Sequence, residues 1–453
     1  MIPPKPPSRP NRVPLWRYAK LFKQDILSAQ PARLYRAWMA EFKTPFFKSF
    51  LINQPDLVKT VLKDRPEDFP KSGRVSEGLR PLLGDSVFLT NGAQWERQRR
   101  IIDPAFEGGR LRDTWHPMRE AAEAAVKRLQ ARAGGIVEIE EDASHAAADV
   151  IFRTLFSIPI EDRMAQQVFH EFRAYQRSQP IVNIAALIPL PRWMPRFFRQ
   201  DTRQAADRIR GLIRQLTERR LDEIKQGTAP DDLATKIMTS VDPDTGETFD
   251  IDEMVDHVAI FFLAGHETSA SALAWGLYLL AIYPEWQEKV AEEAAAFSGD
   301  FSDLSKLRVT RDVFRETLRL YPPVPMMVRE AARAETFRDR RVPKGAQVVL
   351  SPWHLHRHER LWDDPDGFDP SRWATENGKA CARDAYIPFS AGRRVCTGAG
   401  FAMAEGVLLL SAIIRVFRIE AVEGRVPEPA AHLTVRAKHG IHLRIEVRGS
   451  EGN

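Results

Sequence analysis

Apolar side chains recur at helical spacing over much of the chain. In residues 119–133, Ala and Val return every three to four positions among good helix formers, a pattern that predicts a helix. Residues 401–418 (FAMAEGVLLLSAIIRVFR) predict another. Strand-like segments occur near the two ends of the chain, at residues 44–53, 341–351 and 439–449. We therefore expect a mainly α fold with small β-sheets, of the α+β class.

The longest predicted helix begins near Asp250 and meets no proline until Pro284. About 30 residues at 1.5 Å each span roughly 45 Å, enough to cross a whole domain. Its middle, AIFFLAGHETSASALAWGLYLLA, is apolar on nearly every side, as in a helix that is buried throughout. His266 and Glu267 interrupt this stretch, and burying such groups is costly unless they have a use.

The order of these segments gives no sign of a domain boundary. The 453 residues contain no repeat, low-complexity tract or Gly/Ser linker, so we expect one domain over residues 1–453, with two closely packed lobes as the alternative. Residues 172–200 mix apolar residues, prolines and arginines; they predict a loop over the core, or a mobile lid that could also touch a membrane. No run approaches 18 apolar residues, so no spanning helix and no secretory signal are expected.

Charge and cysteine content exclude some classes of protein. The 66 Lys and Arg against 61 Asp and Glu give a net charge of +5. This excess is spread along the chain, unlike the concentrated basic stripe of a nucleic-acid-binding protein. Two cysteines, Cys381 and Cys396, cannot form a disulfide framework. We therefore expect a reduced, cytoplasmic protein. We also expect a monomer.

Cys396 lies in a glycine-rich loop, FSAGRRVCTGAG (residues 389–400). The glycines allow close approach of the backbone, and Arg393, Arg394 and the start of the next helix favour a thiolate. A nucleophile would need a histidine base and zinc would need further nearby ligands; neither is recognisable here. A haem with one axial thiolate then remains, with an inert cysteine in a turn as the alternative.

Phe389, Gly392, Arg394, Cys396 and Gly398 match the loop pattern F-x-x-G-x-R-x-C-x-G. In this the chain resembles the cytochrome P450 monooxygenases, and the resemblance covers nearly its whole length. It implies the cytochrome P450 fold, with a long central helix over the haem. It also implies that Cys396 is the proximal ligand of haem b, that Phe389 packs near the sulfur, and that Arg394 and Gly398 lie at the cofactor.

A second motif lies in the long helix. Residues 264–268 (AGHET) resemble the oxygen-binding pattern of the family, which implies that Ala264 and Gly265 lie beside the haem. Gly265 weakens a helix interior and Thr268 can bond back to the carbonyl of Ala264, so a notch is expected there. Glu267 and Thr268 would handle oxygen and deliver protons. For Gly265 alone, a contact with another helix is an equally credible explanation.

Further residues resemble the propionate ligands of the family. Trp95 and Arg99, in WERQR, lie one helical turn apart, and both are hydrogen-bond donors suited to a carboxylate. Arg329 resembles another propionate-binding arginine. Without the resemblance, a core tryptophan beside a surface arginine would be the simpler interpretation.

The pair Glu316 and Arg319 resembles the E-x-x-R motif, and Arg372, in FDPSRW, resembles the arginine that joins it. An i,i+3 pair is usually an exposed contact of small effect. The apolar context FRETLRLYPPVP suggests burial instead, and a buried pair needs a further partner. The expected role of the three residues is structural.

The substrate pocket is expected to be apolar. Phe261 and Ala264 share the helix face of Thr268, and later segments add further candidates; the complete set is Phe261, Ala264, Val324, Met326, Met327 and Leu433. Ordinary core packing explains each position equally well.

The resemblance implies a monooxygenase that inserts one oxygen atom from O2 into a lipophilic small molecule of the fatty acid, terpenoid or carotenoid, steroid or aromatic class. No fused reductase is expected, so electrons would come from NAD(P)H through a reductase and a ferredoxin or flavodoxin. Arg97, Arg100 and Arg393 are expected to form a positive docking face for that partner. The alternatives are a peroxygenase that uses H2O2, which Glu267 and Thr268 disfavour, and a haem-thiolate sensor or electron carrier.

Overall fold

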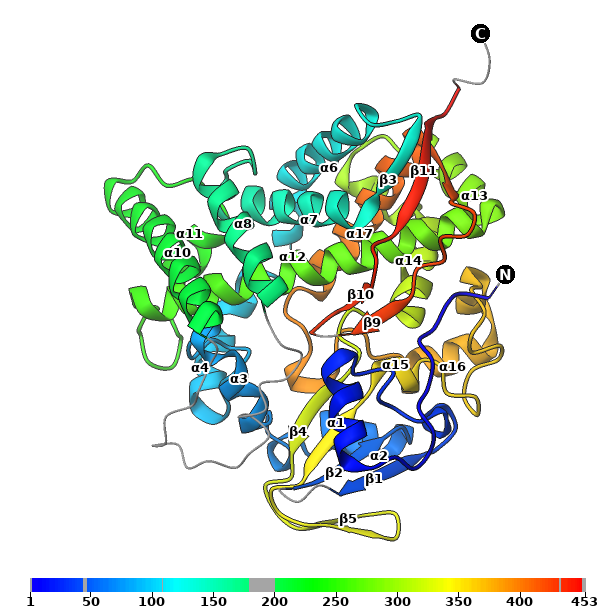
Figure 1. Cartoon of the computed structure of the whole chain (residues 1–453). Coiled ribbons are helices and arrows are strands. Elements are labelled where there is room, and N and C mark those ends of the chain that lie inside the picture. Colours follow the sequence, from blue (N-terminus) through cyan, green and yellow to red (C-terminus); the bar gives the residue numbers. More distant parts are fainter. Residues whose placement is uncertain (1, 44–46, 108, 179–199, 432, 450–453) are drawn as a thin grey trace.

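The computed structural model describes residues 2–43, 47–107, 109–178, 200–431 and 433–449 (Figure 1). Of the predicted loop or lid at residues 172–200, positions 179–199 lie outside this description. The two ends of that segment are helical, because α8 ends at Ser178 and α10 begins at Gln200.

Helices make up most of the described chain. They are α1 (Leu15–Gln24), α2 (Pro55–Lys59), α3 (Gly73–Leu83), α4 (Gly92–Ile102), α5 (Arg110–Asp113), α6 (Trp115–Gln130), α7 (Ile139–Phe156), α8 (Arg163–Ser178), α10 (Gln200–Gln226), α11 (Leu233–Thr239), α12 (Ile251–Ile282), α13 (Pro284–Ala295), α14 (Arg308–Leu320), α15 (Pro352–Leu355), α16 (Glu376–Asp384) and α17 (Ala399–Val416). The helices predicted at residues 119–133 and 401–418 are α6 and α17.

The described strands form small sheets. One has the order β1 (Met39–Lys43), β2 (Lys48–Ile52), β7 (Gln347–Leu350), β4 (Met327–Glu330), and another the order β3 (Gly135–Glu138), β11 (His442–Val447), β8 (Phe417–Ala421). Two antiparallel pairs join β5 (Glu335–Phe337) to β6 (Arg340–Val342) and β9 (Pro429–Ala431) to β10 (Val435–Ala437). The predicted mainly α fold with small sheets is thus confirmed.

The long helix predicted after Asp250 is α12, with 32 residues. It begins with a capping box, in which the Asp250 side chain accepts a hydrogen bond from the Glu253 N–H at 2.8 Å and the Glu253 side chain accepts one from the Asp250 N–H at 3.1 Å. This arrangement satisfies two backbone donors that a helix start leaves free. Pro284 follows its last turn and begins α13. Figure 1 shows α12 running through the middle of the helical part of the molecule, with α7 beside it.

Helix α17, which follows the Cys396 loop, packs against α6, α12, α13 and α14. Within the described ranges it is the one helix that is long and apolar enough to cross a membrane, and 56% of that window is buried inside the protein. Packing between helices accounts for this apolar character.

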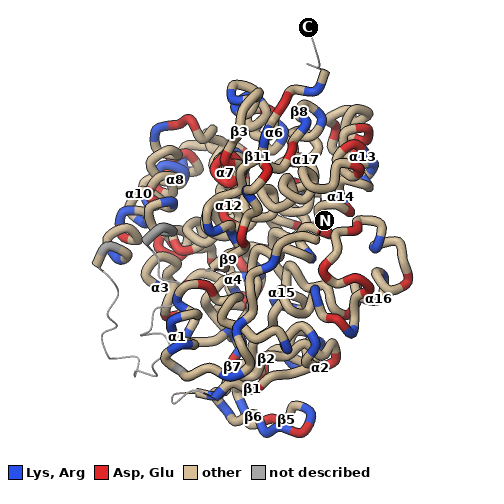
Figure 2. The backbone as a smooth tube through the Cα atoms, turned by 45° about the vertical axis from the view of Figure 1, so that its right-hand side comes forward, with Lys and Arg blue, Asp and Glu red and all other residues tan. Residues whose placement is uncertain are grey.

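The charged residues are mixed in sign over the elements. Lys and Arg are interspersed with Asp and Glu along the chain (Figure 2), and many of them form ion pairs one or two turns apart or across neighbouring helices, such as Arg132 with Asp142 and Arg208 with Glu171. This distribution agrees with the small net charge and gives no continuous basic stripe among the residues described.

Candidate active site

The Cys396 loop makes a tight turn before α17. Ser390 and Gly392 have positive φ values of 64° and 69°, and the Cys396 N–H donates to the Phe389 carbonyl at 2.9 Å. An added Cβ at Gly392 would lie 2.1 Å from the carbonyl oxygen of Leu62, so this position requires glycine. At Gly398 an added Cβ meets no described atom within 4 Å, so protein packing does not demand glycine there.

The thiol of Cys396 lies two residues before the Gly398 N-cap of α17. Although the residue is exposed, the surrounding protein desolvates the thiol and raises its pKa; the Gly398 N–H and the charge of Arg99 oppose this rise. In the protein alone, the effect of burial on the pKa of the Cys396 thiol is therefore larger than the opposing effect of the Gly398 N–H and of Arg99. A metal ion would shift this balance, because a coordinating thiol is deprotonated outright.

The arginines next to the cysteine in the chain, Arg393 and Arg394, do not supply the positive charge that opposes the rise in the pKa of Cys396. Arg393 forms ion pairs with Glu67 at 3.2 Å and with Glu96 at 3.0 Å, and Arg394 donates to the Pro66 carbonyl at 2.6 Å. The expectation that these two arginines favour the thiolate is wrong, because their side chains are engaged elsewhere. The cation that acts on Cys396 is Arg99 of α4, whose Nη1 donates to the Val395 carbonyl at 2.9 Å.

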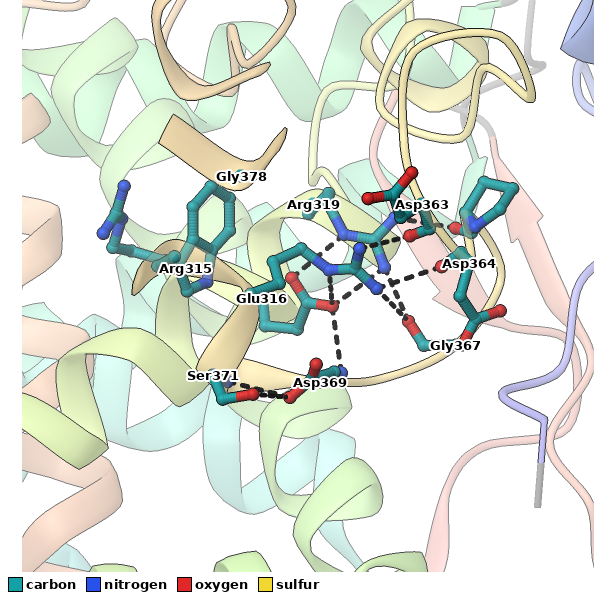
Figure 3. A network of polar contacts seen from close by, with 12 residues as sticks. Arg315, Glu316, Arg319, Asp363, Asp364, Gly367, Asp369, Ser371 and Gly378 are labelled. Carbon is teal, nitrogen blue, oxygen red and sulfur yellow. Dashed lines mark hydrogen bonds and ion pairs between the residues drawn. The ribbon is translucent and has the colours of Figure 1, made fainter. Parts of the chain in front are cut away.

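Glu316 and Arg319 on α14 are fully buried and lie at the centre of a polar network (Figure 3). Arg319 donates to both Glu316 carboxylate oxygens at 2.8 and 2.9 Å, and Arg372 Nε adds a hydrogen bond at 3.0 Å. The Asp369 N–H contributes another at 3.1 Å. The remaining Arg319 donors reach backbone carbonyls, including that of Gly367 at 2.6 Å. The structure thus brings together the three residues expected to have a structural role.

This network extends to the Cys396 loop. Arg319 Nη1 donates to the His356 carbonyl at 2.9 Å, and the Ile387 N–H donates to Nε2 of the same histidine at 2.9 Å. Ile387 precedes Phe389 by two residues, and the Phe389 carbonyl holds the Cys396 N–H. Buried hydrogen bonds therefore connect the E-x-x-R pair to the backbone that positions the cysteine.

A cluster of cations surrounds Trp95, which is buried on α4. Its ring lies 5.6 Å from Lys71 Nζ, 5.7 Å from Arg99 Cζ and 5.2 Å from Arg394 Cζ. Arg329, on β4, adds a further buried charge that acts on Lys71 and is itself affected by the charge of Arg394. The predicted propionate ligands thus lie in one place, although three separate segments supply them.

Sequence reasoning missed Lys71, which belongs to none of the motifs. Its Nζ donates to the Thr90 carbonyl at 3.1 Å, and no described carboxylate pairs with it. Desolvation, followed by repulsion from Arg329, Arg394 and Arg99, lowers its pKa to about 6. Burial and the charge of Arg394 likewise lower the pKa of Arg329, to about 10.

This cluster fits the carboxylates of a haem. Among the described residues, Nε of Arg329 and Nε of Arg394 are buried without a hydrogen-bond partner, and buried polar groups normally have one. Two propionates would supply the missing acceptors and negative charge for these arginines and for Lys71. The cysteine and the nearby cations therefore match the groups that a haem presents, an iron and two carboxylates.

The AGHET segment lies on α12. Thr268 Oγ1 donates to the Ala264 carbonyl at 2.5 Å, as the sequence predicts, and Ala264 is exposed. Gly265 instead faces α7, where an added Cβ would lie 2.4 Å from Cδ1 of Ile151. The structure therefore supports the helix-contact explanation for Gly265 itself, and the oxygen-binding notch at Ala264 and Thr268 stays a prediction. Glu267 is buried, at 6% exposure.

A second acid that the sequence did not indicate, Glu405 on α17, contacts the residue after Thr268 on α12. Ser269 Oγ donates to Oε2 of Glu405 on α17 at 2.6 Å. The other carboxylate oxygen of Glu405 is buried without a partner in the described part of the chain. Desolvation raises the pKa of Glu405 to about 8, so this acid is protonated at neutral pH.

The expected pocket residues lie at the edges of different core clusters. Phe261 packs against the cluster around α7, α8 and α10, Met326 against the one around α6, α14 and α17, and Met327 against the one that includes β2 and β7. Val324 is half-buried and Leu433 is 41% exposed. These partly exposed apolar side chains agree with a lining that faces a space between clusters.

The three arginines expected to form a positive docking face are all ion-paired. Arg97 pairs with Glu253 at 2.6 Å, Arg100 with Asp242 at 2.6 Å, and Arg393 with Glu67 and Glu96. Each side chain thus has carboxylate neighbours that cancel much of its charge beyond a few ångströms. The positive docking face stays a prediction, and the structure adds that carboxylates are interspersed among its three arginines.

Comparisons with known proteins agree with this site. The family model described as cytochrome P450 matches residues 7–444. Cyclooctat-9-en-7-ol 5-monooxygenase of Streptomyces melanosporofaciens is 31% identical over 424 residues, which are 91% of this chain and 88% of that protein. Cytochrome P450 4A11 of Homo sapiens is 31% identical over 477 residues, covering 98% of this chain and 88% of that protein. The solved cytochrome P450DA heme domain is 24% identical and superimposes with a TM-score of 0.80 over 99% of this chain and 98% of its own.

The chain therefore belongs to the cytochrome P450 family, and the resemblance stated from its sequence motifs is confirmed. It is a cytochrome P450 monooxygenase, since the curated relatives are monooxygenases and hydroxylases of this family. Membership implies a haem cofactor, and the solved structure confirms the fold.

Proposed function

We propose that this enzyme hydroxylates a lipophilic small molecule, using O2 and electrons from a separate ferredoxin or flavodoxin. A reductase would recharge that carrier from NAD(P)H. The observation that carries this proposal is the placement of Glu267 and Thr268 on α12, a buried acid followed directly by a hydroxyl beside an exposed alanine. Such a pair suits the delivery of protons to oxygen.

When bound, the haem supplies oxygen activation, which an axial cysteine thiolate promotes by donating electron density. Cys396 would hold the iron. Arg329, Arg394, Lys71 and Trp95 would bind the propionates and fix the plane of the cofactor.

Thr268 Oγ1 would hand a proton to the bound oxygen substrate, and Glu267 would replace that proton. The Thr268 hydroxyl donates its one proton to the Ala264 carbonyl, so it would turn from that carbonyl to act as a donor. Glu267 is the next residue along the helix and is largely shielded from bulk water, so its carboxyl group would be the source that returns a proton to Thr268.

The substrate class follows from the lining. Phe261, Val324, Met326, Met327 and Leu433 offer apolar surface and no charge, which suits a hydrocarbon skeleton. The names of two relatives, cyclooctat-9-en-7-ol 5-monooxygenase and cytokinin hydroxylase, support hydroxylation of a small organic molecule. We propose a terpenoid-like or other largely hydrocarbon substrate with few polar groups.

The test combines ligand titration with turnover. Fatty acids, terpenoid alcohols including cyclooctat-9-en-7-ol, steroids and aromatic ethers are added to the ferric protein, and the spin-state change in the absorption spectrum is followed. Ligands that bind are then incubated with ferredoxin, reductase, NAD(P)H and O2, or with H2O2 alone. We expect hydroxylated product only with the electron-transfer system. Product from H2O2 alone at a comparable rate, or no product from any bound ligand, would overturn the proposal.

A further inference from the structure

The carboxylate of Glu267 is held by a hairpin near the end of the chain. Thr434 Oγ1 donates to Glu267 Oε1 at 2.9 Å, and Arg436 Nε lies 3.6 Å from the same oxygen. Thr434 is 3% exposed and Glu267 6%. A hydrogen bond and an ion pair in so buried a place are worth more than on a surface, and together they define which way the acid points.

The hairpin that supplies these contacts is itself fixed to the core. It consists of β9 and β10, whose register pairs Ala431 with Val435. The Val435 N–H donates to the Pro323 carbonyl at 3.0 Å, and the Ser271 hydroxyl of α12 donates to the Val435 carbonyl. Thr434 therefore stands on backbone that is anchored directly to the helix that carries Glu267.

Arg436 lies between two buried acids. Besides its contact with Glu267, its charge acts on Glu140 of α7 and opposes the rise in the pKa of that group, whose Oε1 accepts the Ala437 N–H at 2.9 Å. The Arg436 side chain is 30% exposed. Arg436 thus extends from the surface to the acid, and its guanidinium adds a charged contact to the carboxylate oxygen that the Thr434 hydroxyl also contacts.

The same turn carries Leu433, which is 41% exposed and is a candidate for contact with the substrate. Leu433 and Thr434 are joined by one peptide bond, yet their side chains have opposite environments. The hairpin therefore exposes an apolar side chain directly beside the residue whose hydroxyl contacts the acid.

We propose that Thr434 and Arg436 are positioning residues for Glu267 in proton delivery. They hold Oε1 in place, so that a proton taken up at Glu267 passes to Thr268 Oγ1 as Thr268 gives up its own, and neither residue is changed at the end of a cycle. This inference rests on the proposed function of Glu267 and Thr268. It adds the hairpin as the element that orients the acid.

The variant that tests this is Thr434→Val, which keeps the shape and removes the hydroxyl. We expect product formed per NAD(P)H to fall several-fold, with hydrogen peroxide increasing and the solvent deuterium isotope effect on kcat growing. The spectral Kd of the substrate should change less than twofold. Thr434→Ser should restore the amount of product formed per NAD(P)H. Arg436→Lys should lower this amount less than Arg436→Gln does.

The matched control is Ser271→Ala, which removes another hydrogen bond to the same hairpin but none to Glu267. We expect it to leave product per NAD(P)H at the wild-type value. Equal uncoupling by Ser271→Ala and Thr434→Val would show that general loosening of the hairpin is responsible, and would overturn the proposal.

A readout independent of turnover is the melting temperature of the purified haem protein. If Thr434 and Glu267 interact, Thr434→Val should lower the melting temperature less in a Glu267→Leu background, which has no acceptor for the Thr434 hydroxyl, than in the wild type. Additive losses would contradict the interaction. If Thr268→Ala uncouples the enzyme and Thr434→Val does not, the hairpin proposal alone fails; if neither variant uncouples it, the function proposed for Glu267 and Thr268 fails as well.

Discussion

Arg372 Nε lies 3.0 Å from Glu316 Oε1, although 56 positions separate the two residues in the chain. Arg319 completes the network from the same helix as Glu316 and donates to both carboxylate oxygens. From here, His356 and Ile387 carry hydrogen bonds to the loop of Cys396. A structural ion pair far from the pocket is thereby connected to the residue that would hold the iron.

Glu316→Ala should therefore give little soluble haem protein. It would leave Arg319 and Arg372 buried without their acceptor, at a cost of about 3–5 kcal/mol, a large share of the stability of a typical domain. The measurements are soluble yield, haem content and melting temperature. The control Glu376→Ala removes the carboxylate of an exposed i,i+3 pair with Lys379 and should change little. Equal behaviour of the two variants would contradict the structural role of Glu316.

Lys71 should make haem retention depend on pH. Without an anionic partner its pKa is about 6, and a propionate beside it would raise that pKa toward the ordinary value. Haem binding then takes up a proton at Lys71 above pH 6, and this contribution lowers the affinity for haem as pH rises, by at most about tenfold per unit. Deprotonation of Cys396 on binding acts in the opposite direction, equally in the wild type and in Lys71 variants.

The measurement is the rate of haem transfer to excess apomyoglobin between pH 6 and 9. We expect Lys71→Met to release haem faster than the wild type at pH 6, and the difference between the two rates to narrow as pH rises, because only the wild type carries the Lys71 contribution. The control is Lys379→Met, since Lys379 is exposed and lies on α16. An unchanged pH dependence in Lys71→Met would exclude Lys71 as a propionate ligand.

Several elements of the fold follow directly from local sequence. Asp250, Glu253 and Pro284 mark both ends of α12, because capping and proline geometry act within a few residues. The motif around Cys396 likewise indicated the metal ligand. The strands β9 and β10 did not stand out, since each has three residues and depends on partners elsewhere in the chain.

The parts of the site that the sequence did not predict depend on distant segments. Lys71 has no motif around it, and its low pKa arises from burial and from three arginines on other segments. Arg393 was misjudged because adjacency to Cys396 in the chain says nothing about Glu67 and Glu96, which engage its side chain. Gly265 fits the family pattern, yet its neighbour is Ile151 of α7, which only tertiary packing defines.

Thr268→Ala should uncouple the enzyme without unfolding it. Alanine is a better helix former than threonine, so the melting temperature should be maintained, and the substrate should bind about as well. Without the hydroxyl, proton delivery fails and reduced oxygen leaves as hydrogen peroxide. The assay follows NAD(P)H, product and hydrogen peroxide in one reaction. A wild-type ratio of product to NAD(P)H would show that Thr268 does not relay protons.

Cys396→Ser should abolish thiolate ligation of haem iron, whereas Cys381→Ser should not. Cys381 is buried on α16, where its sulfur donates to the Leu361 carbonyl at 3.2 Å and desolvation raises its pKa to about 11. It therefore remains a thiol with a structural contact. Cys396 lies in the loop that the buried network positions before α17.

The most direct test of the account is the absorption spectrum of the reduced, CO-bound protein for the wild type and these two variants. We expect the band characteristic of a haem with a thiolate ligand in the wild type and in Cys381→Ser, and its loss in Cys396→Ser. Persistence of that band in Cys396→Ser, or its absence from haem-loaded wild-type protein, would contradict the assignment of Cys396 as the iron ligand.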